Sequence, residues 1–165
     1  MTGETAGQTG LSVIAPPADR RLTQRLIEVW LRTARGRYPS WEDMRRVDLG
    51  SDWNWVFVVD LAKSAAFPHF IYLGSELARL SSVYLSTATD FSLSLLDEAT
   101  ASINLAVSSG APRQAANALT LADGRKILFR SMTAPLAADG ETISHVVGCA
   151  FGRVEGDETP RLRVV

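Results

Sequence analysis

The chain has 165 residues, 46% of them hydrophobic and 21% charged, which is typical of a soluble globular protein. Seventeen basic and eighteen acidic residues give a net charge of -1, which argues against a general nucleic-acid binder. A single cysteine, Cys149, excludes an intramolecular disulfide and favours a reducing compartment. No stretch approaches the ~18 apolar residues of a membrane span, and residues 1–10 lack the positive charge of a secretory signal. We therefore expect a cytoplasmic protein with neither a membrane nor a nucleic-acid partner.

The N-terminal region predicts a leader followed by a helix. Residues 1–18 are rich in Gly, Thr and Ala and close with a Pro-Pro pair, which is typical of a flexible segment. Apolar residues at helical spacing predict an amphipathic helix over 20–35, which Asp19 caps and Gly36 ends. A capping box at Ser40 then opens a short helix toward Asp48.

Arginines are concentrated between residues 20 and 37. Glu28 and the Glu42-Asp43 pair interrupt this segment, and no aromatic side chains alternate with the basic ones as in a nucleic-acid platform. We interpret the arginines as a solvated helix face or the edge of a protein interface.

Residues 53–61 (WNWVFVVDL) are β-branched and aromatic, and they predict a strand. Apolar side chains on both faces predict a central strand that is covered on two sides. One face would carry Trp53, Trp55, Phe57 and Val59, and the other Val56 and Val58. A second strand follows over 67–73, and Pro68 favours its placement at a sheet edge.

The second half of the chain predicts helices and then three strands. Asp90 caps a longer helix, and Ser109-Gly110 followed by Pro112 ends it. Strands are predicted at about 113–121, 125–136 and 142–154, with Asp-Gly hairpin signals at 123–124 and 139–140. Residues 155–165 form a charged tail. The pattern therefore predicts a single domain over 19–154.

Five strands with helices gathered between the second and third predict an α+β fold, an antiparallel sheet with helices on one face. The N-terminal amphipathic helix would cover the other face. This layout resembles the PAS domain family. Two segments carry the resemblance: the run Leu121-Ala122-Asp123-Gly124-Arg125-Lys126, and the last hairpin from Ala134-Pro135-Leu136 through Asp139-Gly140 to 143–148. The stretch 30–60 is similar to a bacterial PAS subfamily that begins with a helix. The resemblance implies a five-stranded sheet in the order 2-1-5-4-3, with the strands at 53–61 and 142–154 in its centre.

Cys149 and the two histidines are the first candidates for chemistry. Flavin-binding light sensors of this fold use a cysteine on the central helix, but the Asn-Cys-Arg type motif is missing there, and Cys149 falls in the last predicted strand. A small core residue is the ordinary interpretation of such a cysteine. His145 and Cys149 cannot form a catalytic dyad, because residues four apart on a strand lie ~13 Å apart.

Other site classes find less support in the sequence. His69 or His145 could ligate haem, as in some PAS sensors, but a lone strand histidine is more often structural. Two histidines and one cysteine lack the ligand spacing of a zinc site, so we expect no metal. The patterns of phosphate-binding glycine loops are absent from the sequence. No cofactor is required by the sequence, and its identity, if one binds, stays open.

Aromatic and apolar residues would enclose the space between sheet and helices, either as packed core or as a small apolar ligand cavity. The candidates for such a pocket are Phe57, Tyr72, Phe91, Leu96, Ile103, Phe129 and Cys149. The apolar arc of the 20–35 helix is wider than one sheet contact requires, which predicts a homodimer built partly on this helix. The candidate interface residues are Leu22, Leu26, Val29 and Trp30. The alternative is that the arc is buried entirely within one chain.

No catalytic constellation emerges, so we expect a protein without enzymatic activity. The resemblance implies a stand-alone PAS sensory and interaction module in bacterial signal transduction, which acts by binding a partner protein, with sensing of a small apolar ligand left open. Two alternatives stay open: a haem- or flavin-binding sensor, and a small α+β enzyme of cone-shaped fold.

Overall fold

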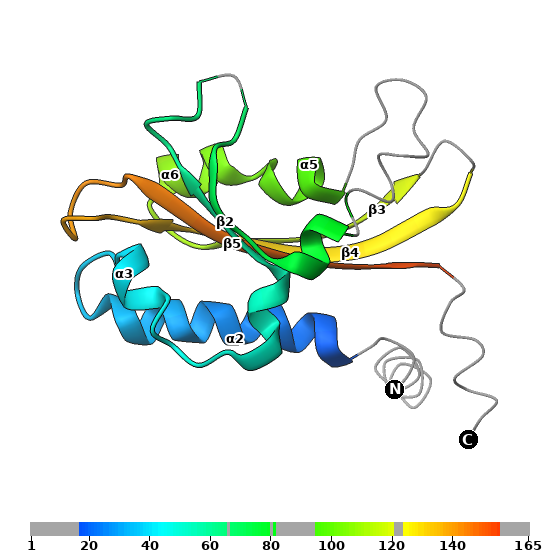
Figure 1. The fold of residues 1–165 in the computed structure, drawn as a ribbon, viewed down its shortest axis with the longest axis horizontal. Coiled ribbons are helices and arrows are strands. Elements are labelled where there is room, and N and C mark those ends of the chain that lie inside the picture. The colour runs from blue at the N-terminus through cyan, green and yellow to red at the C-terminus, as the bar shows by residue number, and fades with distance from the viewer. Residues whose placement is uncertain (1–16, 66, 80, 82–94, 121–123, 156–165) are drawn as a thin grey trace, which may run out of the picture.

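The computed structural model describes residues 17–65, 67–79, 81, 95–120 and 124–155. Of the predicted leader over 1–18, residues 1–16 lie outside the described residues, and residues 17–18 are helical. The pocket candidate Phe91, the capping Asp90 and the tail from 156 onward also lie outside them. Within them, a five-stranded antiparallel sheet runs through the middle of the molecule (Figure 1). Its strands are β1 (Val56–Asp60), β2 (Phe70–Leu73), β3 (Arg113–Thr120), β4 (Lys126–Leu136) and β5 (His145–Val154).

The strand order is β2-β1-β5-β4-β3, and every neighbouring pair is antiparallel. This order confirms the predicted PAS-like α+β fold. Pro68 precedes β2, which lies at the sheet edge as expected. The last hairpin turns at Gly140, whose φ of 84° lies in the left-handed region that glycine adopts freely.

Helices cover both faces of the sheet. Helix α2 (Pro17–Ala34) packs on one face, and α5 (Leu95–Thr100) and α6 (Ile103–Ser109) pack on the other (Figure 1). The predicted single helix in this second layer is instead broken between α5 and α6. At the break, the Ser102 hydroxyl lies 2.9 Å from the Thr133 hydroxyl of β4, and Thr133 is fully buried. The hydrogen bond gives the buried Thr133 hydroxyl a partner that a continuous apolar helix would not supply.

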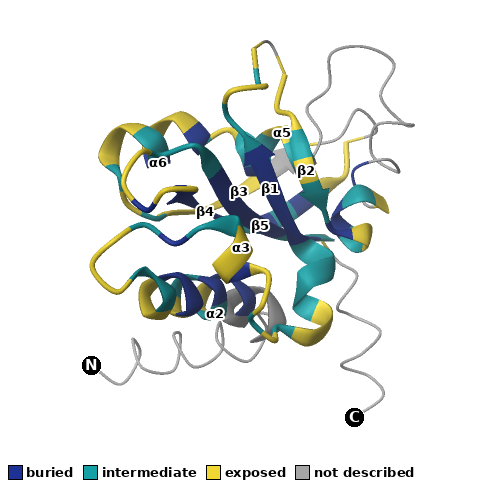
Figure 2. Cartoon of the chain, turned by 60° about the vertical axis from the view of Figure 1, so that its left-hand side comes forward, coloured by how far each residue is buried: buried dark blue, intermediate teal, exposed yellow. Residues whose placement is uncertain are grey.

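Two apolar cores result, one on each face of the sheet. The α5/α6-side core contains Phe57, Val59, Leu77, Ala99, Ile103, Ile127, Phe129, Val146 and Ala150. The α2-side core contains Leu22, Leu26, Val29, Trp30, Met44, Val56, Val58, Met132, Ala134, Leu136, Val147 and Cys149. In Figure 2 the buried colour follows the central strands and the side of α2 that faces them. The alternation of Val56 and Val58 with Phe57 and Val59 between the cores confirms a central strand covered on two sides.

The candidate dimer contacts of the N-terminal helix lie inside the chain's own core, and the homodimer stays a prediction. Leu22, Leu26, Val29 and Trp30 are all buried against the sheet of their own chain. Trp30 also donates its indole N–H to the carbonyl oxygen of Pro135, at 2.7 Å. These four side chains cover the back of the sheet, which is apolar on both faces, while Leu31 on the same helix stays 57% exposed.

Trp53 and Trp55 do not belong to the first strand. They lie in a 3-10 helix, η1 (Gly50–Trp55), and pack with the α2-side core, on the face opposite to the one predicted. Asp48 accepts a hydrogen bond from the Gly50 backbone N–H at 3.0 Å, and Gly50 has a φ of 56°. This local side-chain bond offers the backbone an alternative to the sheet, so the strand begins only at Val56.

Candidate functional site

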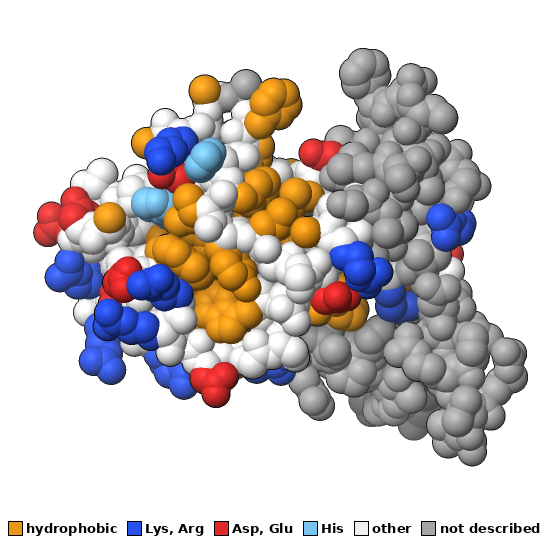
Figure 3. All heavy atoms as spheres, viewed as in Figure 1, with side chains coloured by type: hydrophobic (Ala, Val, Ile, Leu, Met, Phe, Trp, Pro, Cys, Tyr) orange, Lys and Arg blue, Asp and Glu red, His pale blue; other side chains and the backbone are white. Residues whose placement is uncertain are grey.

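A pocket of about 260 Å³ lies between the loop that joins β1 to β2 and helix α6. Its lining is mostly apolar with three polar side chains: Val59, Leu61, Ser64, Ala65, Phe67, Pro68, Thr100, Ile103 and Asn104. Such a composition, apolar walls with a few polar groups, is typical of small-molecule sites, although this volume fits only a small ligand. Phe67 is 83% exposed, and Figure 3 shows hydrophobic side chains at the tip of this loop. We call this the hairpin pocket.

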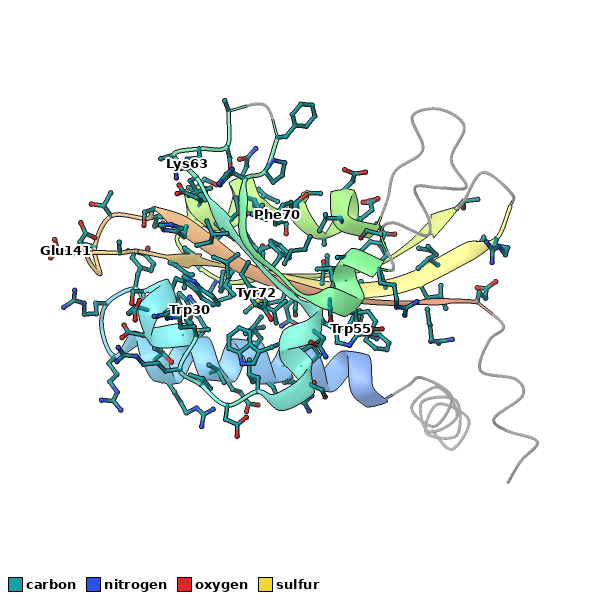
Figure 4. The ribbon with its side chains drawn as sticks, in the orientation of Figure 1. Trp30, Trp55, Lys63, Phe70, Tyr72 and Glu141 are labelled. Atoms are coloured by element: carbon teal, nitrogen blue, oxygen red, sulfur yellow. The ribbon has the colours of Figure 1, made fainter. Side chains whose placement is uncertain are left out.

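The loop beside the hairpin pocket is held by its own side chains. Ser64 donates its hydroxyl to the carbonyl oxygen of Asp60 at 2.6 Å and accepts the backbone N–H of His69 at 2.9 Å. The carboxylate of Asp60 accepts the backbone N–H of Ala62 at 3.0 Å. Figure 4 shows Lys63 in this loop, standing away from the sheet on the side of α6. The loop is therefore a defined turn rather than an extension of the two strands.

The predicted pocket residues separate into two groups. Phe57, Leu96, Ile103 and Phe129 come together in the α5/α6-side core, and of these Ile103 also lines the hairpin pocket. Phe57 is fully buried and meets Phe70 edge-on, with ring centroids 5.9 Å apart. The space directly over β1 is thus filled with side chains. The hairpin pocket opens beside this packed region, at the end of β1.

Tyr72 does not border the hairpin pocket, because a β-bulge turns it to the other face. Val58 pairs with Tyr72 and Val59 with Phe70, which leaves Ile71 as an extra residue in β2. Phe70 therefore packs with the α5/α6-side core and Tyr72 with the α2-side core, as their positions in Figure 4 illustrate. The Tyr72 hydroxyl donates to the carbonyl oxygen of Trp53 at 2.8 Å, and desolvation raises the pKa of the phenol.

Cys149 is also on the α2 side, fully buried in β5. Desolvation raises the pKa of its thiol far above the ordinary value, and the nearby negative charge of Asp52 raises it further. A backbone hydrogen bond with Met132 lowers the pKa, but by less. The thiol stays protonated and inert at neutral pH. Because the sheet separates Cys149 from α5 and α6, the thiol cannot attack a ligand bound in the hairpin pocket.

The Ser144 hydroxyl, the His145 imidazole and the Asp60 carboxylate lie close together where β5 begins beside the end of β1. The sequence did not reveal this grouping. The Ser144 hydroxyl lies 2.8 Å from Nδ1 of His145, and Nε2 of His145 lies 3.8 Å from a carboxylate oxygen of Asp60. His145 and Asp60 are cross-strand partners of β5 and β1. Only the register between two distant strands brings them together, so no spacing along the chain could have signalled it.

The Ser144–His145–Asp60 group has an ordinary structural role. The Ser144 hydroxyl also accepts the backbone N–H of Ala138 at 3.0 Å, so it fastens the last hairpin turn. His145 is on the same strand as Cys149, which agrees with the exclusion of that pair as a dyad. Among the described residues, no three or more His, Cys, Asp or Glu side chains gather as metal ligands. Nor does any described helix have the length and apolar character to cross a membrane.

Comparisons with known proteins return only distant structural likenesses. No protein-family model and no curated protein sequence matches the chain. Among solved structures, the light-state structure of the blue-light photoreceptor Aureochrome1 LOV is 14% identical with a TM-score of 0.41, over 67% of this chain and 89% of that one. The LOV protein of Rhodobacter sphaeroides is 12% identical with a TM-score of 0.40, over 87% and 74%. The N-terminal domain of a diguanylate cyclase with PAS/PAC sensor from Marinobacter aquaeolei is 14% identical with a TM-score of 0.37, over 58% and 91%. The fold assignment therefore depends on the strand order of the sheet and on the helices that cover it.

Proposed function

We propose that this chain is a PAS-type sensory and interaction module of bacterial signal transduction, which binds a partner protein under the control of a small ligand. The observation that carries the proposal is the hairpin pocket, a small open pocket of six apolar and three polar residues between a sheet and a helix. Its exposed Phe67 gives a direct connection between the pocket and the protein surface. A ligand that moved the loop would change the apolar surface offered to a partner.

The pocket can be filled without disturbing the core. Asn104 lines the pocket but is exposed, so Asn104→Trp adds an indole there without replacing a buried side chain. Leu105, its neighbour on α6, is 56% exposed and is not among the lining residues, so Leu105→Trp is the matched control. Native mass spectrometry of protein purified from its own host should show a co-purifying small molecule on the wild type and on Leu105→Trp, and not on Asn104→Trp. Retention by all three proteins would contradict the assignment of the site.

The proposal includes the absence of enzymatic activity. Ser144, His145 and Asp60 are the one arrangement of the described residues that resembles a nucleophile with a base and a carboxylate. A broad hydrolase screen should find no turnover above background. Turnover that disappears in Ser144→Ala, with the melting temperature unchanged, would make the chain an enzyme and overturn this part of the proposal.

A further inference from the structure

A second and larger cavity lies on the opposite side of the sheet from the hairpin pocket, where α2 ends and α3 (Trp41–Met44) begins. Its volume is about 540 Å³, within the range of ordinary ligand sites. Four arginines line it, Arg32, Arg35, Arg37 and Arg46, together with the single carboxylate of Asp43. Figure 3 shows basic side chains gathered on the side of the molecule where these elements meet. We call this the arginine pocket.

The arginine pocket concentrates positive charge in a chain whose net charge is -1. Neither Arg32 nor Arg35 forms an ion pair with any described residue. Arg37 donates to the carbonyl oxygen of Asp139 at 2.6 Å, which orients its guanidinium without neutralising it. Three of the four guanidinium groups therefore have no carboxylate partner in the described part of the chain.

Two of the acidic groups near the pocket, Asp43 and Glu42, are already engaged. Asp43 forms a capping box with Ser40, in which the two side chains accept each other's backbone N–H groups. Glu42 pairs with Arg45 at 2.7 Å and reaches Arg46 only at 3.5 Å, and these hydrogen bonds and charges lower the pKa of its carboxyl. Neither carboxylate forms an ion pair with Arg32 or Arg35, although Asp43 lines the same pocket.

The backbone at Arg35 adds an independent observation. Arg35 has a φ of 45°, in the left-handed region that glycine occupies at helix ends, and Gly36 follows with a φ of 84°. A side chain with a Cβ is disfavoured there, and such strain is concentrated at functional sites. An arginine at this position costs folding stability, and it supplies a guanidinium to the pocket.

Apolar groups complete the lining and indicate the rest of the ligand. Val29, Ala34 and Val47 line the pocket beside the ring of Tyr38. Tyr38 is fixed from three elements, since its backbone N–H donates to Gly140 at 3.0 Å, its hydroxyl donates to Gly110 at 3.2 Å, and its ring lies 6.4 Å from Trp30. A rigid apolar wall beside unpaired guanidinium groups suits a molecule with an apolar or planar body and several anionic groups.

We propose that the arginine pocket binds a small polyanion, a molecule with two or more phosphate or carboxylate groups. The guanidinium fork matches both groups with paired hydrogen bonds, which is why arginine predominates where such anions are recognised. The same chemistry is available from a soluble organic phosphate and from an anionic lipid headgroup. This inference is independent of the hairpin pocket and of the proposed sensory role.

Calorimetric titration with inorganic tripolyphosphate and with citrate, in 50 mM salt, tests the proposal. The wild type should bind one of these probes saturably with a 1:1 ratio, and more weakly as the salt concentration rises. Arg32→Gln combined with Arg35→Gln should weaken binding by roughly tenfold or more. As a control, Arg79→Gln removes one positive charge outside the pocket, where Arg79 pairs with Glu76, and should change the affinity less than about twofold.

Arg35→Gly separates binding from folding, because it removes the charge and places glycine where the backbone favours it. We expect weaker binding together with an unchanged or higher melting temperature. A parallel sedimentation assay uses vesicles of phosphatidylcholine with and without cardiolipin, whose headgroup carries two phosphates. Sedimentation only with the anionic vesicles, lost in the double variant, would support the pocket with a headgroup as ligand. Absence of binding to every probe, or equal loss in Arg79→Gln, would overturn the proposal.

Discussion

The indole of Trp30 in helix α2 donates a hydrogen bond of 2.7 Å to the carbonyl oxygen of Pro135 in β4, across 105 positions of sequence. It joins the N-terminal helix to a central part of the sheet inside the α2-side core. Because β4 at Pro135 is paired with β5, this bond links the helix to the two longest strands. The helix is thereby an integral part of the domain.

Trp30→Phe is expected to lower the free energy of unfolding by about 1–3 kcal/mol, because it leaves a buried carbonyl oxygen without its donor. The adjacent Leu31 is 57% exposed, and Leu31→Ala should change the stability by no more than about 0.5 kcal/mol. Urea denaturation measures both values. The homodimer stays a prediction, and light scattering should give the same mass for both variants as for the wild type. If Trp30→Phe abolished a dimer without changing the free energy of unfolding, Trp30 would be shown to lie in a dimer interface.

Phe129 and Phe67 give a second matched pair of substitutions. Phe129 is 4% exposed in the α5/α6-side core, so Phe129→Ala should cost about 3–5 kcal/mol. Phe67→Ala removes the same atoms from an exposed position and should cost about 0.5 kcal/mol or less. Chemical denaturation of the two variants compares them directly. A small loss at Phe129 would mean that the space around it is a cavity and not packed core.

The Cys149 thiol should not react with an alkylating reagent in the folded protein at neutral pH. Its burial and its raised pKa both disfavour the thiolate that reacts. In denaturant, one equivalent of reagent should be consumed, since the chain has one cysteine. Stoichiometric labelling of the native protein within minutes would show that β5 is accessible from the α2 side.

Asp139 predicts a pH dependence at the last hairpin turn. Hydrogen bonds from the backbone N–H groups of Glu141 and Thr142 hold the pKa of its carboxyl below the ordinary value. The pKa of Asp139 is therefore lower in the folded than in the unfolded protein, so the ionised carboxylate stabilises the fold. This stabilisation is fully present above the unfolded pKa of ~3.9 and is lost as the pH falls through the folded pKa. Asp139→Ala should therefore be less stable than the wild type at pH 7, with a difference that narrows at pH 3. Urea midpoints measured at both pH values check this, and an equal difference at both would contradict it.

Arg35→Gly is expected to stabilise the fold by about 1 kcal/mol, because an L side chain in the left-handed region costs about 1–2 kcal/mol and the greater freedom of glycine in the unfolded chain offsets part of the gain. Arg32→Gln, one turn earlier on the same helix, provides the control and should be neutral within about 0.5 kcal/mol. Thermal unfolding compares the two. A destabilised Arg35→Gly would show that the arginine makes a structural contact at this helix end.

The sequence by itself determined the strands of the second half of the chain and the turns between them. Asp-Gly signals and apolar runs predicted the last three strands to within a few residues, and Pro68 predicted the edge strand, because turn residues and strand alternation act over short distances. The capping box at Ser40 was predicted for the same reason, and it is present. From these elements, the resemblance to the PAS family gave the strand order.

The tertiary structure decided which face each side chain occupies. One extra residue at Ile71 moves Tyr72 to the α2 side, and the η1 turn does the same for Trp53 and Trp55. A strand has a period of two, so a single bulge or a late strand start reverses every later assignment, and local sequence carries little information about either. The same limit applies to the two sites. The arginine pocket and the Ser144–His145–Asp60 group depend on register and on helix ends that only packing across the whole domain fixes.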